Sequence, residues 1–347
     1  MNPESDRPTV EEQAARIFGW RQGFNALHII DLGERLGLFA ALAAAPGASA
    51  DGLAARLGLH PPYVAIWCKT AYSLALLDGD SQGFRLAPHI GELLADPGHP
   101  RYLGGYVRLG TEFATDDYRR AEALFRNGQS VPFQGRGERF ADTIAQATAG
   151  LQVLAARKLL PSLPGLAEAL AEGGVLLEVG CGAGKALLQM AKAFPKARLV
   201  GVDLDPDGIA LARAAIARAG LEARVEIKQR PLDQAVAADS CAAVVMIQVL
   251  HEIEPAIRPG VLAGAARALA PGGWLLIVDE TYPETLAELR QPEFRFPIQT
   301  GIEELLWGNV VPTRSEQERL LTEAGFTGPL ERALVGEGFT VLSTRKP

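Results

Sequence analysis

A glycine-rich segment that begins with an acidic residue has the composition of a nucleotide-binding loop. Residues 178–184 read Glu-Val-Gly-Cys-Gly-Ala-Gly and lie between a short apolar run and a segment with helical spacing. Glycines let the backbone approach a ligand without a Cβ in the way, and the N–H groups of the following helix face the ligand's polar end. Glu178, Gly180, Gly182 and Gly184 are therefore candidate cofactor-binding residues.

A second acidic residue, Asp203, ends the next apolar run and is followed by Leu204. A carboxylate at the end of a second strand accepts hydrogen bonds from ribose hydroxyls, so the two segments predict a cofactor that contains adenosine. The spacing is not the G-x-G-x-x-G of dinucleotide-binding loops. Lys185 is followed by Ala186, which has no hydroxyl for the magnesium ion of a P-loop. Glu178 repels a pyrophosphate and suits a cationic ligand. A simple packing turn is the alternative.

Residues 176–206 (LLEVGCGAGKALLQMAKAFPKARLVGVDLDP) resemble the first two motifs of class I S-adenosylmethionine-dependent methyltransferases. The resemblance implies that Asp203 holds the ribose hydroxyls, that Leu204 flanks the adenine, and that the loop 180–184 wraps the methionine part of the cofactor. It also implies contacts from Leu232 to the adenine face and from Gln248. The acid that usually meets the adenine amino group is missing, and Gln229 or Asp233 is the candidate replacement.

A histidine, His251, follows the fourth apolar run, where the end of a strand faces the cofactor crevice. A neutral imidazole there can take a proton from an acceptor hydroxyl, and Asp279, at the end of the next run, can orient the ring. The alternative is a structural histidine that caps a helix.

The segments VLHEI and LAPGGWLLIVDE resemble the small-molecule O-methyltransferases of the plant phenol and bacterial polyketide type. This implies O-methylation with His251 as general base and Asp279 as helper acid, although Ile253 replaces a tryptophan and Thr313 replaces a second helper acid. The S-methyltransferases of dimethylsulfoniopropionate synthesis are similar in plan. They act on a thioether acid such as 4-methylthio-2-hydroxybutyrate, which has no proton to lose and needs no base.

The resemblance places the acceptor site in residues 293–313, with Trp307 and Asn309 near the substrate. Tyr102, Tyr106 and Tyr118 in the connecting helices are candidates to cover the site. A core tryptophan, a helix-ending asparagine and a packing tyrosine are the alternatives. Arg295 or Arg314 is a candidate for an acceptor carboxylate, with a surface ion pair as the simpler interpretation. No metal site is predicted, because the remaining histidines lack ligand spacing: His28, His60, His89 and His99.

The elements that position these residues fall into three predicted segments. Residues 1–100 read as helix, turn, helix, turn and strand, which is the order of a winged-helix domain, with a break in the first helix near Gly33 or Gly37, a cap at Ser49 and a turn at residues 77–80. Residues 101–172 read as a helical connector with a loose stretch at 127–137. Residues 173–347 alternate short strands with helices, which predicts a Rossmann-like parallel α/β sheet that ends in an antiparallel hairpin.

Composition narrows the possible partners. The 347 residues carry a net charge of −7, which gives no overall attraction for nucleic acid or an anionic membrane. Three separated cysteines, the absence of an apolar leader and the absence of a membrane span predict a cytoplasmic protein. The resemblance implies a homodimer through residues 1–100. A DNA-binding regulator that senses S-adenosylmethionine is the alternative, but the predicted recognition helix, 61–77, has Lys69 as its only charge.

Overall fold

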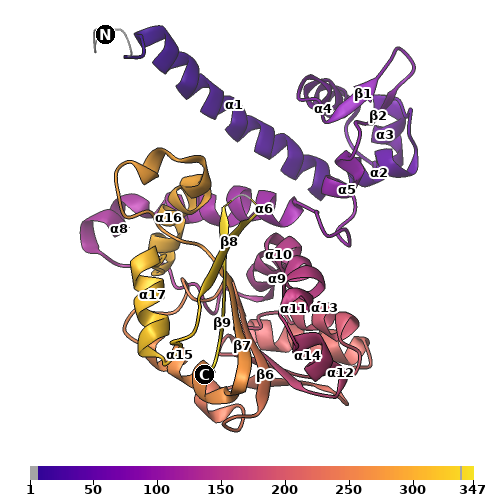
Figure 1. Ribbon diagram of the computed structural model, residues 1–347. Helices are drawn as coiled ribbons and strands as arrows, with labels where there is room; N and C mark the ends of the chain where they lie inside the picture. Colours follow the sequence, from indigo (N-terminus) through magenta and orange to yellow (C-terminus); the bar gives the residue numbers. More distant parts are fainter. Residues whose placement is uncertain (1–6, 337) are drawn as a thin grey trace. The chain divides into compact units, whose positions relative to one another are not determined.

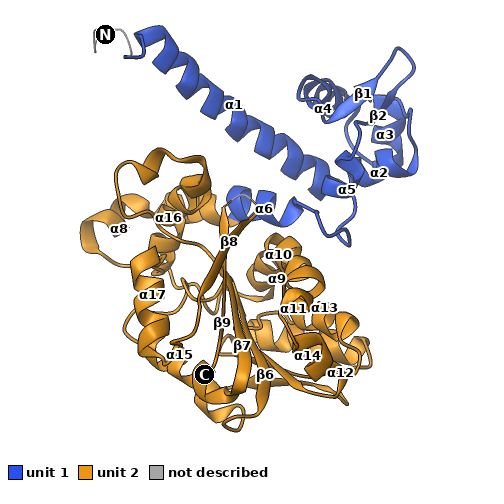
Figure 2. Ribbon diagram, in the orientation of Figure 1, with its two compact units in different colours: residues 1–112 blue, residues 113–347 orange. Residues whose placement is uncertain are grey.

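The computed structural model describes residues 7–336 and 338–347. The N-terminal residues in which no apolar leader was found, 1–6, and Glu337, in the predicted turn between the last two strands, lie outside the described residues. The chain divides into two compact units, Met1–Glu112 and Phe113–Pro347 (Figure 2). The predicted connector, 101–172, contributes residues to both units.

The first unit is mostly helical, and its helix ends follow from local sequence. Thr9 and Glu12 form a capping box at the start of the first helix, and Gly37, at φ +71°, separates it from the second. Ser49 accepts a hydrogen bond from the N–H of Gly52 and caps the third helix. The elements are α1 (Val10–Arg35), α2 (Leu38–Ala44), α3 (Ala50–Leu57), α4 (Pro61–Ser73), β1 (Leu77–Gly79), β2 (Phe84–Leu86), α5 (Ile90–Leu94) and α6 (Gly104–Arg108) (Figure 1).

The segment predicted as a turn at residues 77–80 is instead largely a strand. β1 pairs with β2 in an antiparallel hairpin, and Leu77 is 1% exposed in the core of the unit. The turn lies one step later, where the side chain of Asp80 accepts a hydrogen bond from the N–H of Gln82. The prediction was wrong because Asp-Gly was read as the turn, whereas the buried leucine before it fixes the hairpin register.

One face of α1 is apolar and exposed within its unit. Ile17, Phe18, Trp20 and Phe24 are between 51% and 69% exposed. Soluble monomers rarely expose so continuous an apolar surface, which is typical of an interface.

The second unit is built on a seven-stranded sheet with the order β5-β4-β3-β6-β7-β9-β8. The first five of these strands are parallel, and β9 runs antiparallel to both of its neighbours. The predicted parallel α/β sheet with a C-terminal hairpin is therefore confirmed. The strands are β3 (Val175–Val179), β4 (Arg198–Asp203), β5 (Val225–Gln229), β6 (Cys241–Ile247), β7 (Leu269–Asp279), β8 (Glu331–Val335) and β9 (Phe339–Arg345).

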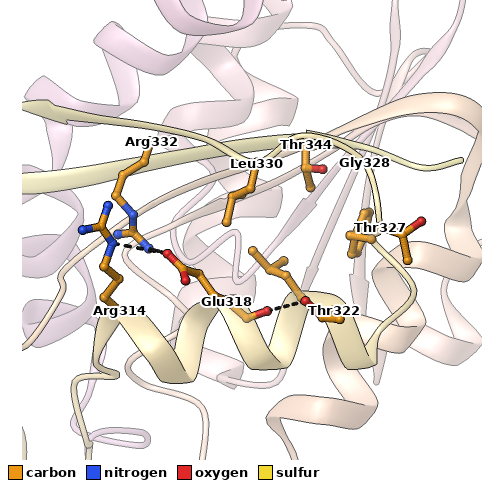
Figure 3. Close-up of a pocket in the computed structure, with 10 residues that line it drawn as sticks. Arg314, Glu318, Thr322, Thr327, Gly328, Leu330, Arg332 and Thr344 are labelled. Atoms are coloured by element: carbon orange, nitrogen blue, oxygen red, sulfur yellow. Dashed lines mark hydrogen bonds and ion pairs between the residues drawn. The ribbon is translucent and has the colours of Figure 1, made fainter.

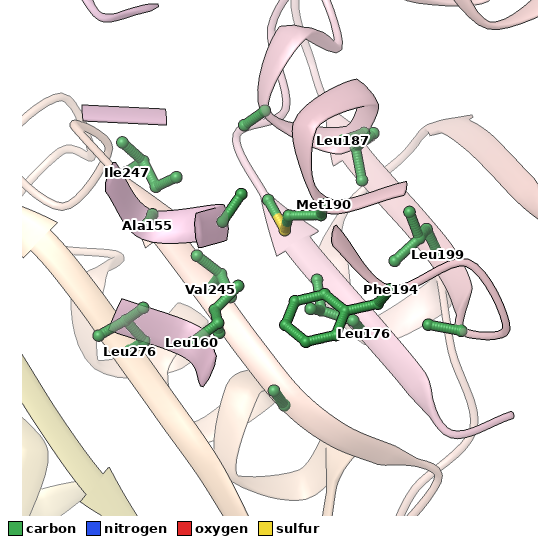
Figure 4. Close-up of a cluster of buried hydrophobic side chains, with 14 of the residues drawn as sticks. Ala155, Leu160, Leu176, Leu187, Met190, Phe194, Leu199, Val245, Ile247 and Leu276 are labelled. Carbon is green, nitrogen blue, oxygen red and sulfur yellow. The ribbon is translucent and has the colours of Figure 1, made fainter. Parts of the chain in front are cut away.

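Helices cover both faces of this sheet because alternate strand residues point to opposite sides. Leu176 packs in one core with side chains from α10 to α14, including Leu160 and Met190 (Figure 4). Its neighbour Leu177 packs in a second core with side chains of α15 and α17, such as Leu262. The sheet is thus doubly wound, and the carboxyl ends of its parallel strands are where a ligand site is expected.

The remaining elements complete the second unit, with η1 spanning the boundary between the units. They are η1 (Leu109–Ala114), α7 (Thr115–Tyr118), α8 (Ala121–Asn127), α9 (Glu138–Ala147), α10 (Ala149–Leu154), η2 (Ala155–Leu159), α11 (Leu160–Ser162), α12 (Leu166–Ala171), α13 (Lys185–Ala193), α14 (Pro206–Arg218), η3 (Leu232–Gln234), α15 (Arg258–Ala268), η4 (Glu288–Arg290), η5 (Pro292–Phe294), α16 (Arg295–Trp307) and α17 (Arg314–Glu323).

The predicted loose stretch is a loop that connects two distant helices. Residues 128–137 carry no helix or strand. The N–H of Val131 donates to the carbonyl of Leu306 at the end of α16, over 2.6 Å. The N–H groups of Gly135 and Gly137 donate to Asp205 and Asp207, at the start of α14, over 3.2 and 2.9 Å. The loop therefore ties α16 to the segment that follows β4.

Two general features of the described residues bear on the predictions. None of their helices combines the length and apolarity needed to cross a membrane. Cys68, Cys181 and Cys241 are buried and free.

Candidate active site

The glycine loop joins β3 to α13. At Gly180, its first glycine, the surrounding side chains leave no room for a larger residue. Gly180 has φ +70°, and a Cβ there would lie 2.4 Å from Cγ2 of Val249. Gly184, at φ +72°, is the N-cap residue of α13. The glycines thus serve a tight crossing between strand and helix.

Asp203, at the end of β4, holds this loop in place. Its carboxylate accepts hydrogen bonds from the N–H groups of Gly182, Leu204 and Asp205 over 2.7, 2.7 and 2.9 Å. Burial raises the pKa of Asp203, and these three donors oppose that rise. The structure therefore brings the predicted ribose-binding acid into direct contact with the predicted methionine-binding loop.

Two buried polar groups beside the loop have an atom without a partner among the described residues. Glu178 is 3% exposed, and its Oε2 accepts no hydrogen bond. Burial, and then the charge of Asp203, raise the pKa of Glu178 well above its usual value. Gln248 has φ +57°, and its Nε2 donates no hydrogen bond. Because an unsatisfied buried polar atom is costly, these groups fit a ligand that is itself cationic and polar.

The predicted adenine contacts are more dispersed. Leu204 is 52% exposed, as a residue that flanks a ligand would be. Leu232 lies on η3 beside Gly264 of α15, whose added Cβ would be 3.2 Å from Cδ2 of Leu232. Gln229 donates to the carbonyl of Leu204 over 3.3 Å, and Asp233 is exposed. The residue that meets the adenine amino group stays a prediction.

His251 is 2% exposed and is held by the carboxylate at the end of β7. Its Nδ1 lies 2.6 Å from Oδ1 of Asp279, whose Oδ2 accepts from the N–H groups of Val249 and Leu250 over 3.1 and 2.7 Å. His251 caps no helix, since the following helix α15 has Ile257 as its N-cap residue. The structure therefore brings the predicted base and its predicted helper acid together.

Carboxylates determine the charge state of this histidine. Burial of the ring lowers the pKa of His251, but Asp279 and Glu304 raise it further, so that it stands well above its usual value. Burial raises the pKa of Asp279, but the neighbouring His251 and backbone donors lower it overall. Both shifts favour an imidazolium paired with a carboxylate, so the neutral, proton-accepting ring prevails only above the raised pKa of His251.

Two acidic residues near His251 were missed by the sequence analysis. Oε2 of Glu304, on α16, lies 3.6 Å from Nε2 of His251. Glu280 follows Asp279 directly, and burial and neighbouring carboxylates raise its pKa to about 7. One potential metal-ligand atom from each of His251, Glu280 and Glu304 lies within 4.8 Å of the others. The sequence analysis predicted no metal site and did not bring these three residues together. Glu304 follows Glu303 within a helical segment, and nothing in the sequence around it indicates that it lies beside His251.

The predicted acceptor-site residues are found in different places. Trp307 is 5% exposed, packs against Phe133 and donates its Nε1–H to Asp117 over 2.8 Å. Asn309 is buried and donates its Nδ2–H to Oε2 of Glu304 over 2.8 Å, which connects it to His251. Tyr106 lies on α6, in the first unit, and its place in the acceptor site stays a prediction.

The helix after the acceptor segment carries structural contacts. Thr313 caps α17 by accepting the N–H of Glu316, so the residue at the position of the second helper acid has a structural role. Arg314 pairs with Glu318 on the surface, as the simpler interpretation predicted. A pocket between α17 and β8 is lined by Arg314, Glu318, Arg332 and their neighbours, and Arg314 is the one predicted site residue in that lining (Figure 3).

Comparisons with known proteins identify the enzyme class of the chain. A family described as a methyltransferase domain matches residues 176–273. Over 251 residues the chain is 29% identical to 3-hydroxy-5-methyl-1-naphthoate 3-O-methyltransferase of Streptomyces sahachiroi, covering 70% of each chain. Over 114 residues it is 32% identical to carboxy-S-adenosyl-L-methionine synthase of Dichelobacter nodosus, which covers 33% of this chain and about half, 47%, of that enzyme.

The fold is also that of solved methyltransferases. Human N-acetylserotonin methyltransferase, in complex with S-adenosylmethionine, superposes with a TM-score of 0.78 at 18% identity, over 98% of this chain and 99% of that one. At this identity the likeness shows the fold alone. The match to the methyltransferase domain is a sequence match, and its range includes the glycine loop and Asp203. The chain is an S-adenosylmethionine-dependent methyltransferase, with S-adenosylmethionine as its cofactor.

Proposed function

We propose that the enzyme methylates a hydroxyl group of a small molecule and that His251 is the general base. The observation that carries this proposal is the 2.6 Å contact between Nδ1 of His251 and Asp279. It leaves Nε2 as the ring atom that takes a proton, at the strand ends where the cofactor loop lies. The relative from Streptomyces sahachiroi, by its name, methylates a hydroxyl oxygen, which supports the same class of acceptor here.

S-adenosylmethionine supplies an electrophilic methyl group on a sulfonium sulfur. The residues of this chain do the rest. Nε2 of His251 takes the proton of the acceptor hydroxyl while the oxygen forms a bond to the methyl carbon. The bond between the methyl carbon and the sulfonium sulfur breaks in the same step, and its electron pair stays on the sulfur, which becomes a neutral thioether. Asp279 holds the imidazolium that results. Burial of both side chains excludes water from the proton transfer.

The cofactor residues are proposed from the same geometry. Glu178 would accept from the amino group of the methionine part, and Asp203 would accept from the ribose as well as from its loop. Leu204 and Leu232 would contact the adenine, and Gln248 would donate to a polar cofactor atom. The loop glycines Gly180, Gly182 and Gly184 would line the backbone path around the methionine part.

Two measurements test these assignments. Asp203→Ala should abolish binding of S-adenosylmethionine in calorimetry, whereas Glu222→Ala, at an exposed position with no proposed cofactor role, should not change it. His251→Ala should slow methyl transfer to a phenol by about 10²–10⁴-fold while leaving cofactor affinity intact. A panel of phenols, hydroxy acids and thioether acids with methyl-labelled cofactor identifies the acceptor. Methyl transfer to a hydroxyl at a normal rate in His251→Ala would contradict the role of His251 as general base.

A sulfur acceptor is the alternative that this panel separates. A thioether has no proton to lose, so the His251–Asp279 pair would have no proton to accept. Labelled product from 4-methylthio-2-hydroxybutyrate at the same rate in His251→Ala would replace O-methylation with S-methylation.

The first unit is proposed to be a winged-helix dimerisation domain. The apolar exposed face of α1 supports a second copy as its partner. Trp20→Glu should convert a dimer to a monomer in light scattering, with Gln22→Glu, on the same helix, as control. The exposed side of α4 carries Tyr63 and Ile66, so burial in an interface is favoured over binding of DNA.

A further inference from the structure

Glu304 lies beside the proton-accepting atom of His251, yet the mechanism above gives it no role. Its Oε2 is 3.6 Å from Nε2, within ion-pair range but too long for a hydrogen bond. The side chains of both residues are buried, at 9% and 3% exposure. The two atoms therefore lie close together without a hydrogen bond between them.

Within the described part of the chain, the carboxylate of Glu304 accepts a hydrogen bond from one side chain, that of Asn309. Nδ2 of Asn309 donates to Oε2 over 2.8 Å, and a carboxylate oxygen can accept a second hydrogen bond. Among the described residues, no lysine or arginine forms an ion pair with Glu304. A buried carboxylate with spare acceptor capacity is stabilised by a further donor, which a ligand at Nε2 is placed to supply.

We propose that Glu304 determines acceptor specificity: with Nε2 of His251 it forms a two-point site for a molecule that carries a second hydrogen-bond donor beside the reacting hydroxyl. A catechol is the simplest example. Its two hydroxyls lie at about hydrogen-bond spacing, so one reaches Nε2 while the other donates to Oε2. This inference rests on the proposed O-methylation and names the class of acceptor for it.

The acidic residues around the site disfavour an acceptor that carries a carboxylate beside its hydroxyl. Glu280 belongs to the same cluster as Glu304 and His251, and Asp279 occupies the other ring nitrogen. Arg258 donates to the main-chain carbonyl of His251, away from Nε2. An acceptor with a carboxylate beside its hydroxyl would bring a like charge to these acids and lose affinity.

The experiment compares catechol, phenol and salicylate as probes. Their dissociation constants are measured by ligand-observed NMR on full-length protein saturated with S-adenosylhomocysteine, in EDTA so that no metal occupies the acidic cluster. The variants are Glu304→Gln, which keeps the shape but removes the charge, and Glu303→Gln as the matched control one position away. Thermal unfolding checks that each variant is folded.

In the wild type and in Glu303→Gln, catechol should bind at least about tenfold more tightly than phenol, and salicylate should bind most weakly. In Glu304→Gln the preference for catechol should fall severalfold, and salicylate should gain affinity. Equal binding of catechol and phenol, no saturable binding of catechol, or an unchanged ratio in Glu304→Gln would overturn the proposal. If the ratio changes as expected but His251→Ala still methylates, the specificity stands and the general base does not.

Discussion

The carboxylate of Asp279 is 2.6 Å from Nδ1 of His251, and this contact leaves Nε2 as the ring nitrogen that Asp279 does not occupy. Because the same carboxylate also accepts two backbone N–H groups, its position is set by the loop after β6. The ring of His251, the proposed base, is therefore held in one orientation by these contacts, and such preorganisation is a large part of catalysis by positioning.

Asp279→Asn should reduce kcat by about 10²–10⁴-fold and leave the affinity for S-adenosylmethionine unchanged. An amide keeps the size of the side chain but can donate to Nδ1, which puts the proton on the wrong ring nitrogen. Rates with the acceptor found in the screen, together with cofactor calorimetry, check this. A variant with normal kcat would show that the pair is structural.

Activity should rise with pH, because only the neutral imidazole accepts a proton. The pKa of His251 lies well above 6.5, so the acid limb of kcat/KM should also lie above that pH. Glu304→Gln removes one of the charges that raise this pKa and should move the limb to lower pH. The measurement is kcat/KM against pH in both proteins, and an identical limb would contradict the influence of Glu304.

Gly180→Ala should weaken cofactor binding more than Gly182→Ala. Both positions have positive φ, but a Cβ at Gly180 would lie 2.4 Å from Val249, whereas nothing lies within 4 Å of one at Gly182. The left-handed backbone costs about 1 kcal/mol in either variant, and the clash adds to it only at the first. Calorimetry measures the difference, and Val249→Ala in the Gly180→Ala background should recover part of it.

Glu303→Gln should stabilise the protein at alkaline pH and have little effect in acid. Burial, then Glu304 and Asp117, raise the pKa of Glu303 from 4.5 to about 7. The stability linked to this group is fully present below pH 4.5 and is lost as pH rises through 7, because the buried group then ionises. The variant should gain about 1–3 kcal/mol at pH 8.5, after allowance for partial exposure. Urea unfolding at pH 4 and pH 8.5 tests the sign.

The sequence predicted the parts of this protein whose positions depend on local pattern. Strands alternating with helices gave the sheet, and the strand-end positions of Asp203, His251 and Asp279 placed them at one edge. Glu304 was missed because its closeness to His251 arises from the packing of α16, which returns to the sheet edge after an irregular segment. No spacing along the chain encodes that approach. The hairpin at Leu77 was misplaced because a turn dipeptide was weighed above the burial of its neighbour.

The position of β9 has a consequence for biosynthesis. This strand lies between β7 and β8, and Thr340 pairs with Asp279 across the ladder. Residues 339–345 follow β7 only after a long helical stretch of the chain, yet they form the interior of the sheet rather than its rim. During synthesis β7 therefore remains an edge strand until β9 has emerged, and Asp279 lacks its ladder partner until then.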